Sequence, residues 1–131
     1  MKKSYSDSYM LNLWRKAVKT YDGDQCIFDG QTPVECHHIV KRRHFVTRYD
    51  HKNGIPLCSN CHYLADTILM KKMILNYIGE KRYNYLIDRE MISKKEFLLE
   101  HALTEFEFKK SQVEELKKII DEKITVMEDL F

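Results

Sequence analysis

Two adjacent histidines, followed at set intervals by an asparagine and a third histidine, constrain this chain more than any other feature. His37 and His38 stand together, Asn53 follows His38 by 15 residues, and His62 follows Asn53 by nine. Asp66 comes four residues later. Imidazole, amide and carboxylate groups are what a hydrolytic centre with one divalent ion needs: a base, a group to orient that base, and metal ligands. The fold that these residues require is one that gathers them at a single point.

Length and composition narrow the class of protein. A chain of 131 residues forms one small domain, with or without an appendage. It has no run of about 18 apolar residues, so we expect no membrane span, and its basic N-terminus lacks the apolar core of a secretion signal. We therefore expect an intracellular, cytoplasmic protein.

Hydrophobic periodicity predicts a helix, then a short hairpin, then another helix. Three- and four-residue spacing of apolar residues predicts the first helix, and turn residues bound the short apolar strands. A helix beginning at Ser59 would place His62 and Asp66 four residues apart on one face, with Cβ atoms about 6 Å apart. The predicted segments are a helix at Ser6–Thr20, strands at Val34–Val40 and Gly54–Leu57 around a basic loop at Lys41–Asn53, and a helix from Ser59 to about Tyr77.

The C-terminal part is predicted to be helical. Glu80 to Met91 forms one predicted helix, and the capping-box sequence that begins at Ser93 starts another. If that helix ran from Lys94 to about Leu130, it would be roughly 55 Å long. Apolar residues recur along it every seven positions, joined at the complementary heptad position by Ala102, Leu116 and Leu130; the seven-residue series is Leu99, Phe106, Val113, Ile120 and Met127.

Two interpretations of this apolar stripe are open. The stripe packs on the chain's own core, or it forms a coiled coil in a homodimer, which we favour because a small core cannot cover so long a helix. A second capping box beginning at Ser111 could split the helix and fold it back.

Positive charge is concentrated beside the histidines. Residues 41–52 carry five Lys or Arg against one acidic residue, whereas residues 67–131 carry 12 basic and 13 acidic residues. A phosphate backbone would be attracted to the first segment. The candidate phosphate contacts are Lys41, Arg42, Arg43, Arg48 and Lys52.

Together these residues resemble the HNH endonucleases, also called ββα-metal nucleases. The resemblance extends from Tyr9 to Asp66. It rests on Trp14-Arg15-Lys16-Ala17-Val18, Asp22-Gly23, Cys26, His37-His38-Ile39, Asn53-Gly54-Ile55-Pro56-Leu57-Cys58 and Cys61-His62. It implies an α+β fold with a small ββα-metal core at residues 25–78, an N-terminal helix at residues 1–24 packed on it, and a helical extension at residues 79–131.

The resemblance also implies a role for each residue of the motif. His38 would be the general base and Asn53 would orient it. His37, His62 and Asp66 would bind the catalytic ion, with His62 also counted in the catalytic set; the carboxylate of Asp66 stands where relatives commonly have histidine, and favours Mg²⁺ or Mn²⁺.

The cysteines predict a second metal site. Cys58 and Cys61 form a Cys-x-x-Cys pair, which in an intracellular chain indicates metal binding before a disulfide. Relatives with two such pairs hold a structural Zn²⁺, and here Asp29 stands where the partner of Cys26 would be. Cys26, Asp29, Cys58 and Cys61 could form the site. The alternatives are Cys36 as the fourth ligand, or no metal at all.

The implied function is a divalent-metal-dependent DNA endonuclease that hydrolyses phosphodiester bonds, of phage recombination, branched-DNA or homing type. One alternative is a zinc-knuckle nucleic-acid-binding module that has lost cleavage. Another is an assembly adaptor that works through the C-terminal helix.

Overall fold

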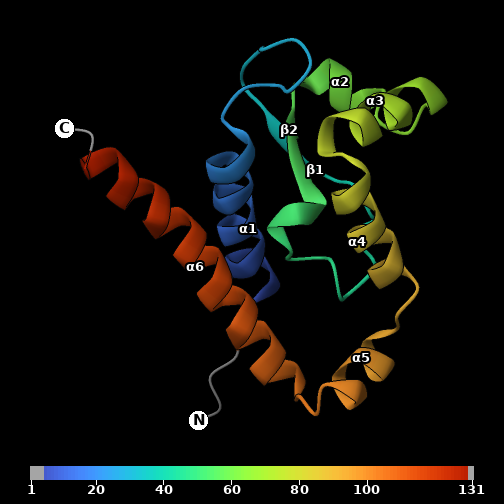
Figure 1. Cartoon of the computed structure of the whole chain (residues 1–131), viewed down its shortest axis with the longest axis vertical. Coiled ribbons are helices and arrows are strands. Elements are labelled where there is room, and N and C mark those ends of the chain that lie inside the picture. Colours follow the sequence, from blue (N-terminus) through green and yellow to red (C-terminus); the bar gives the residue numbers. More distant parts are fainter. Residues whose placement is uncertain (1–4, 130–131) are drawn as a thin grey trace.

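A short antiparallel hairpin lies at the centre of the molecule, with helices on both sides (Figure 1). The computed structural model describes residues 5–129, and the side chains of residues 5–122. Strand β1 (Glu35–His38) pairs with β2 (Gly54–Leu57) so that His37 lies opposite Ile55 and His38 opposite Gly54. The predicted α+β class is confirmed, although β1 is shorter than the predicted strand at residues 34–40.

The first helix packs tightly against the start of β2. Helix α1 (Asp7–Asp22) begins at Ser6, whose hydroxyl accepts a hydrogen bond from the Tyr9 N–H. A Cβ atom added to Gly54 would lie 2.4 Å from a methyl of Val18 and 2.6 Å from the ring of Trp14. Glycine is therefore required at this position, because any side chain would push α1 off the hairpin.

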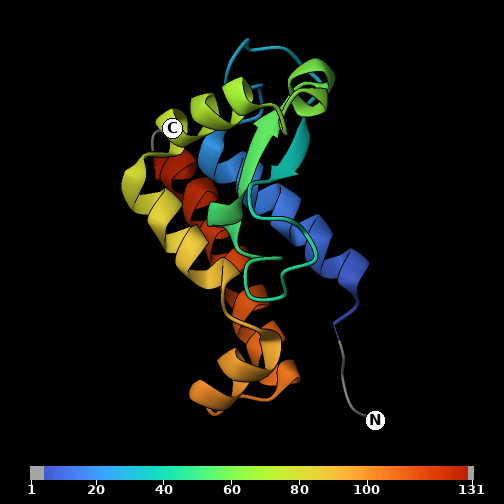
Figure 2. The same cartoon turned by 90° about the vertical axis from the view of Figure 1, so that its right-hand side faces the viewer.

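The predicted single helix from Ser59 to Tyr77 is wrong. It is divided into α2 (Ser59–Tyr63) and α3 (Ile68–Ile78), which run in different directions (Figure 2). The Thr67 hydroxyl donates to the Leu64 carbonyl and accepts from the Met70 N–H, so it ends one turn and caps the next helix. Asp66 lies in this turn, so it does not share a helix face with His62.

Helix α4 (Glu80–Glu90) is bound to the hairpin and to α1 by one arginine. The Arg82 guanidinium donates to both carboxylate oxygens of Asp22, at 3.1 and 3.2 Å, and to the Gly54 carbonyl at 2.9 Å. It also donates to the Lys52 carbonyl, which belongs to the short 3₁₀ turn η1 (His51–Asn53). These bonds join the C-terminal region to the core through charge-assisted contacts.

The predicted long C-terminal helix is also wrong. It is split into α5 (Lys94–Glu100) and α6 (Glu105–Asp129). Ala102 has a φ of 53°, a left-handed conformation that ends a helix. Thr104 and Glu107 then exchange hydrogen bonds between side chain and backbone N–H, which is a capping box. The break therefore comes before α6 and not at Ser111, which lies inside it.

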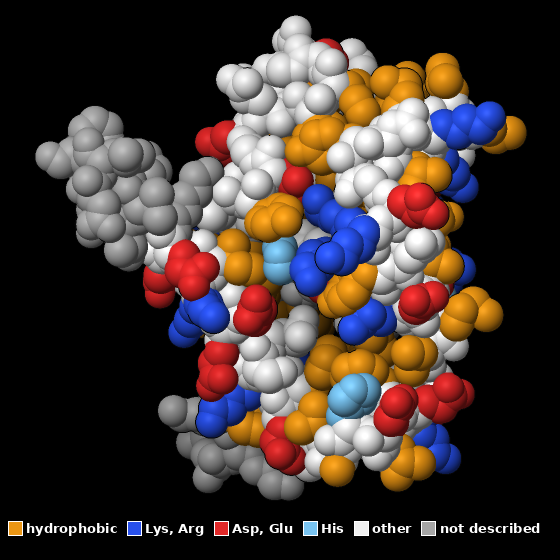
Figure 3. Space-filling view, in the orientation of Figure 1, with side chains coloured by type: hydrophobic (Ala, Val, Ile, Leu, Met, Phe, Trp, Pro, Cys, Tyr) orange, Lys and Arg blue, Asp and Glu red, His pale blue; other side chains and the backbone are white. Residues whose placement is uncertain are grey.

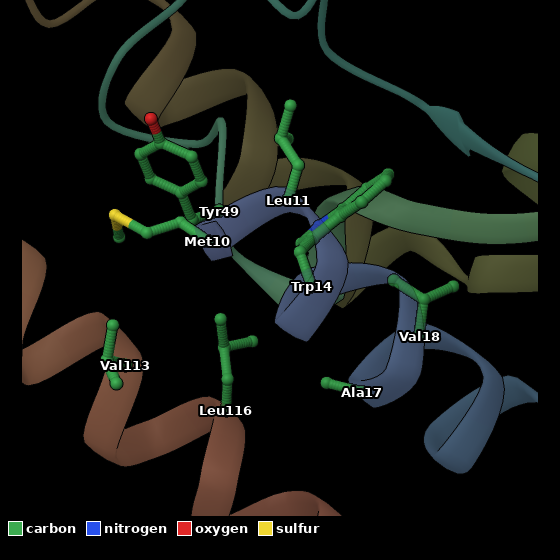
Figure 4. Close-up of a cluster of buried hydrophobic side chains, with 8 residues drawn as sticks. All are labelled: Met10, Leu11, Trp14, Ala17, Val18, Tyr49, Val113 and Leu116. Atoms are coloured by element: carbon green, nitrogen blue, oxygen red, sulfur yellow. The ribbon is translucent and has the colours of Figure 1, made fainter. Parts of the chain in front are cut away.

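Helix α6 crosses α1 and completes the main hydrophobic cluster (Figure 4). Val113 and Leu116 are 2% and 1% exposed, and they face Met10 and Ala17 of α1. Leu99, by contrast, is 78% exposed. The middle of the apolar stripe thus packs on the chain's own core.

The homodimer and the three-part division at residues 1–24, 25–78 and 79–131 stay predictions. The side chains of Met127 and Leu130, at the end of the stripe, lie outside the described residues. Within residues 5–129, none of the helices combines the length and the apolar character that a membrane crossing would require.

Candidate active site

The histidines of the motif line one cavity. It has a volume of about 570 Å³ and lies between β1, α1 and the α2–α3 turn. His37, His38, His62 and Asp66, which the sequence analysis assigned to the catalytic centre, all contribute to its wall. The structure therefore brings three imidazoles and a carboxylate to one cavity, although Asp66 lies in the turn between α2 and α3 and not in a helix.

His38 is held in one orientation. Its ring stacks on the indole of Trp14, with centroids 3.9 Å apart and planes 9° from parallel. Its Nε2 lies 2.9 Å from the Arg48 carbonyl oxygen. A carbonyl only accepts hydrogen bonds, so Nε2 carries the proton and Nδ1 keeps a free lone pair.

The surroundings of His38 keep it neutral. Burial lowers its pKa to about 4, against the opposing effect of the bond to the Arg48 carbonyl. The positive charges of Arg48, Arg42 and Arg15 lower the pKa further. A neutral imidazole with an unshared lone pair is the form that takes a proton from water.

Asn53 holds the loop beside His38, and the hydrogen bonds of its side chain go to the backbone of that loop and not to the His38 ring. The Asn53 side chain is fully buried. Its Oδ1 accepts from the Val40 N–H at 2.6 Å, and its Nδ2 donates to the carbonyls of Val40 and Thr47 at 3.0 and 3.1 Å. Thr47 precedes Arg48, so Asn53 acts on His38 through the loop backbone. The predicted direct orientation is thus replaced by an indirect one.

His37 and His62 face each other across the cavity, and Glu35, which the sequence analysis missed, pairs with His62. Their ring centroids are 5.2 Å apart. His62 Nδ1 lies 2.5 Å from a carboxylate oxygen of Glu35, which leaves Nε2 of His62 for another partner. Burial and the nearby His62 lower the pKa of His37 to about 4. Its imidazole is therefore neutral near pH 7 and can offer a nitrogen lone pair to a metal ion. Glu35 and His37 are two residues apart on β1, so they lie on the same face of the strand. That spacing was the sequence signal that could have identified Glu35 as part of the site.

Asp66 is paired with a lysine. Its Oδ1 accepts from Lys41 Nζ at 2.7 Å, and this bond is the main cause of the lowered pKa of Asp66. Both side chains are exposed, so the pair is weak and can be exchanged for other partners. The carboxylate is therefore ionised and faces the cavity, but it is not yet free to bind a cation.

A second cluster of metal-binding side chains lies at the knuckle beside the hairpin. The ligand atoms of Cys26, Asp29, Cys58 and Cys61 all lie within 4.8 Å of one another. The thiols of Cys58 and Cys61 donate to Asp29 Oδ2, at 3.2 and 3.6 Å. Burial, together with the Cys58 and Cys26 thiols, raises the pKa of Cys61 to about 12. Cys36 is not part of the cluster, since its thiol donates to the Arg15 carbonyl.

The side chains predicted to contact phosphate differ in whether they are exposed or already engaged in contacts within the protein. Arg42 and Arg43 are exposed, and Arg42 lines the cavity. Arg48 instead forms a two-pronged ion pair with Asp7, and Lys52 lies over the ring of Tyr85. The prediction that Arg48 contacts DNA is therefore at odds with its place in the structure, because its guanidinium is already occupied.

Two further basic side chains line the cavity and were missed. Arg15 and Lys19 project from α1 toward the same wall as Arg42. Their four-residue spacing on a helix was visible in the sequence, but nothing there showed which face of the helix meets the hairpin. Elsewhere, exposed apolar side chains gather at the α2–α3 end of the molecule (Figure 3); they include Tyr63, Leu64, Ile68 and Leu69.

The Asp7–Arg48 pair makes stability depend on acid pH. The bond to Arg48 is the main cause that lowers the pKa of Asp7 from 3.8 to about 2, so its stabilisation is present above pH 4 and lost as the pH falls toward 2. Asp7 is 46% exposed, so solvent screening limits the effect to below about 1 kcal/mol. Urea unfolding of wild type and Asp7→Asn should differ more at pH 5 than at pH 2.5. An equal difference at both values would contradict this assignment.

One comparison with known proteins found a family that the region of this site resembles. Residues 23–65 match the family model described as HNH endonuclease. The matched segment contains Cys26, the whole hairpin, Asn53 and His62, and it ends just before Asp66. Searches of curated proteins and of solved structures found no match. Residues 23–65 of the chain are therefore similar to the HNH endonuclease family.

Proposed function

We propose that this protein is a divalent-metal-dependent endonuclease that hydrolyses phosphodiester bonds in DNA, with His38 as the general base. The observation that carries the proposal is the state of His38. Its Nε2 is bound to a carbonyl and its ring is fixed on Trp14. Its neutral imidazole faces a cavity that it shares with two other histidines. A base held in this way can remove a proton from a water molecule placed in the cavity.

The residues opposite His38 fit a divalent cation. His37 and His62 offer imidazole nitrogens, and Glu35 orients His62 as carboxylates commonly orient metal-binding histidines. Asp66 adds a carboxylate, once Lys41 releases it. We infer that these residues hold Mg²⁺ or Mn²⁺. The ion would stabilise negative charge on the phosphate and the leaving oxygen.

The basic residues around the cavity are proposed to bind the DNA backbone. Arg42 is exposed and lines the cavity, the exposed Arg43 follows it in the chain, and Arg15 and Lys19 approach the cavity from α1. Lys41 could exchange Asp66 for a phosphate when a cation occupies the site. The phage recombination, branched-DNA or homing type of substrate stays a prediction.

A plasmid assay tests the proposal. Supercoiled plasmid is incubated with the protein and Mg²⁺, Mn²⁺ or EDTA, together with linear and four-way-junction DNA. We expect nicked or linear products with a divalent ion and none with EDTA. Intact plasmid under every condition would contradict the nuclease function.

One observation favours a nucleic-acid-binding module as the second candidate. Among the described residues, only the cysteine cluster has its metal-ligating atoms already gathered, whereas Asp66 and His62 are occupied by Lys41 and Glu35. A gel-shift measurement beside the plasmid assay separates the two functions. DNA binding without cleavage in any divalent metal would favour the binding module.

We further propose that Cys26, Asp29, Cys58 and Cys61 bind a structural Zn²⁺. Three thiolates and one carboxylate are ligands that zinc accepts in a tetrahedral site, and their atoms are close enough to share one ion.

The zinc site predicts one Zn²⁺ per chain, measured by atomic absorption after purification and dialysis. Cys58→Ser should lose the metal and lower the melting temperature, because the ion joins the knuckle to β2. Cys36→Ser is the matched control, since Cys36 lies outside the cluster and should leave the zinc content unchanged. Zinc-free wild type, or equal losses in the two variants, would contradict the site.

A further inference from the structure

We propose that Asp7, at the start of α1, is a positioning residue for His38: it anchors Arg48 so that the Arg48 carbonyl holds the His38 ring in one tautomer. This inference rests on the proposed role of His38 as the general base. Asp7 lies outside the segment that matches the HNH family model.

The contacts of Asp7 form a small closed network. Its Oδ1 accepts from Arg48 Nε at 2.8 Å and its Oδ2 accepts from Arg48 Nη2 at 2.6 Å. The Tyr49 hydroxyl also donates to Oδ1. The remaining nitrogen of the guanidinium, Nη1, donates to the Arg42 carbonyl at 2.9 Å, so it joins the beginning of the basic loop to its middle. Paired N–H bonds to a carboxylate fix direction as well as distance.

The same residue that Asp7 anchors supplies the acceptor for His38. Arg48 uses its side chain for Asp7 and its backbone carbonyl for His38 Nε2. The backbone on both sides of Arg48 is also held, because Asn53 Nδ2 donates to the Thr47 carbonyl and Trp14 Nε1 donates to the Asp50 carbonyl at 2.8 Å. The carbonyl of Arg48 therefore has little freedom to turn away from the imidazole.

Helix α1 is the rigid element that joins these contacts. Asp7 and Trp14 are seven residues apart, which is close to two helical turns, so they lie on one face. Trp14 fixes the plane of the His38 ring, and Asp7 fixes the loop that fixes its tautomer. A helix outside the family match thus sets both the orientation and the proton position of the base.

A purely structural role for Asp7 would give a different result, and α1 offers a matched control. Asp22 lies at the other end of the same helix, and it also pairs with an arginine, Arg82. The Asp22 side chain is 5% exposed against 46% for Asp7. Asp22→Asn should therefore lower stability at least as much as Asp7→Asn does.

The test is ¹⁵N NMR of the His38 ring in the full chain at a fixed neutral pH, together with single-turnover cleavage. Wild type and Asp22→Asn should show His38 protonated at Nε2 alone. Asp7→Asn and Arg48→Lys should show a mixture of the two tautomers. We expect the single-turnover rate constant at saturating protein to fall about 10- to 100-fold in these two variants, with DNA affinity unchanged, because small misplacement of a catalytic group has effects of that size.

Two results would overturn the proposal. One is an unchanged His38 tautomer in both Asp7→Asn and Arg48→Lys; the other is an equal tautomer mixture in Asp22→Asn. Arg48→Lys keeps the charge but loses the two-pronged contact, so it decides the matter if Asp7→Asn does not fold. The NMR spectrum reports on positioning even if wild type cleaves no DNA, so failure of this inference is distinct from failure of the nuclease function.

Discussion

Replacing His38 with glutamine is expected to lower the single-turnover rate of DNA cleavage by about 10²- to 10⁴-fold, the range for loss of a general base. Glutamine has a similar size, and its amide nitrogen can still donate to the Arg48 carbonyl, which now binds His38 Nε2. It cannot accept a proton from water at neutral pH. The rate is measured with protein in excess over labelled DNA, in Mg²⁺ and in Mn²⁺.

The control for this variant is a histidine far from the cavity. His101 is exposed and stacks on Phe97 near the end of α5, so His101→Gln should cleave at the wild-type rate. DNA affinity, measured in Ca²⁺ to prevent cleavage, should change less than threefold in His38→Gln. A His38→Gln protein that cleaves within threefold of wild type would remove His38 from the mechanism.

Replacing Asn53 with alanine is expected to destabilise the protein by about 3 kcal/mol or more. The side chain is fully buried and makes three hydrogen bonds, to the Val40 N–H and to the carbonyls of Val40 and Thr47. Its removal leaves buried backbone groups without partners, at about 1–3 kcal/mol each. Urea unfolding, followed by circular dichroism, measures the free energy.

Asn84 provides the comparison for Asn53. It is an exposed residue of α4, so Asn84→Ala should change stability by less than about 0.5 kcal/mol. Asn53→Asp should also be strongly destabilising, because a carboxylate can accept from the Val40 N–H but cannot donate to the two carbonyls. A loss below about 1 kcal/mol in Asn53→Ala would show that the loop finds other partners for these groups.

The break between α5 and α6 could have been predicted from the sequence. Thr104 and Glu107 have capping-box spacing, as Ser111 and Glu114 do. Only the first pair starts a helix, whereas the Ser111 hydroxyl donates to the Phe108 carbonyl inside α6. The sequence offers both capping signals, and it does not show which of them is used.

The sequence by itself determined the hairpin, the order of its histidines and the cysteine knuckle. These depend on neighbours in the chain: alternation on a strand brings His37 to one face and His38 to the other, and Cys58 and Cys61 are three residues apart.

Only the tertiary structure decided which charged groups are free and which are already paired. Asp7 with Arg48, Glu35 with His62, and Lys41 with Asp66 are separated by 41, 27 and 25 residues. A sequence shows that such charges exist, but their partners depend on which surfaces meet when α1 packs on the hairpin. That packing is driven by burial of apolar side chains, which has no preferred direction, so it leaves no charge pattern in the sequence.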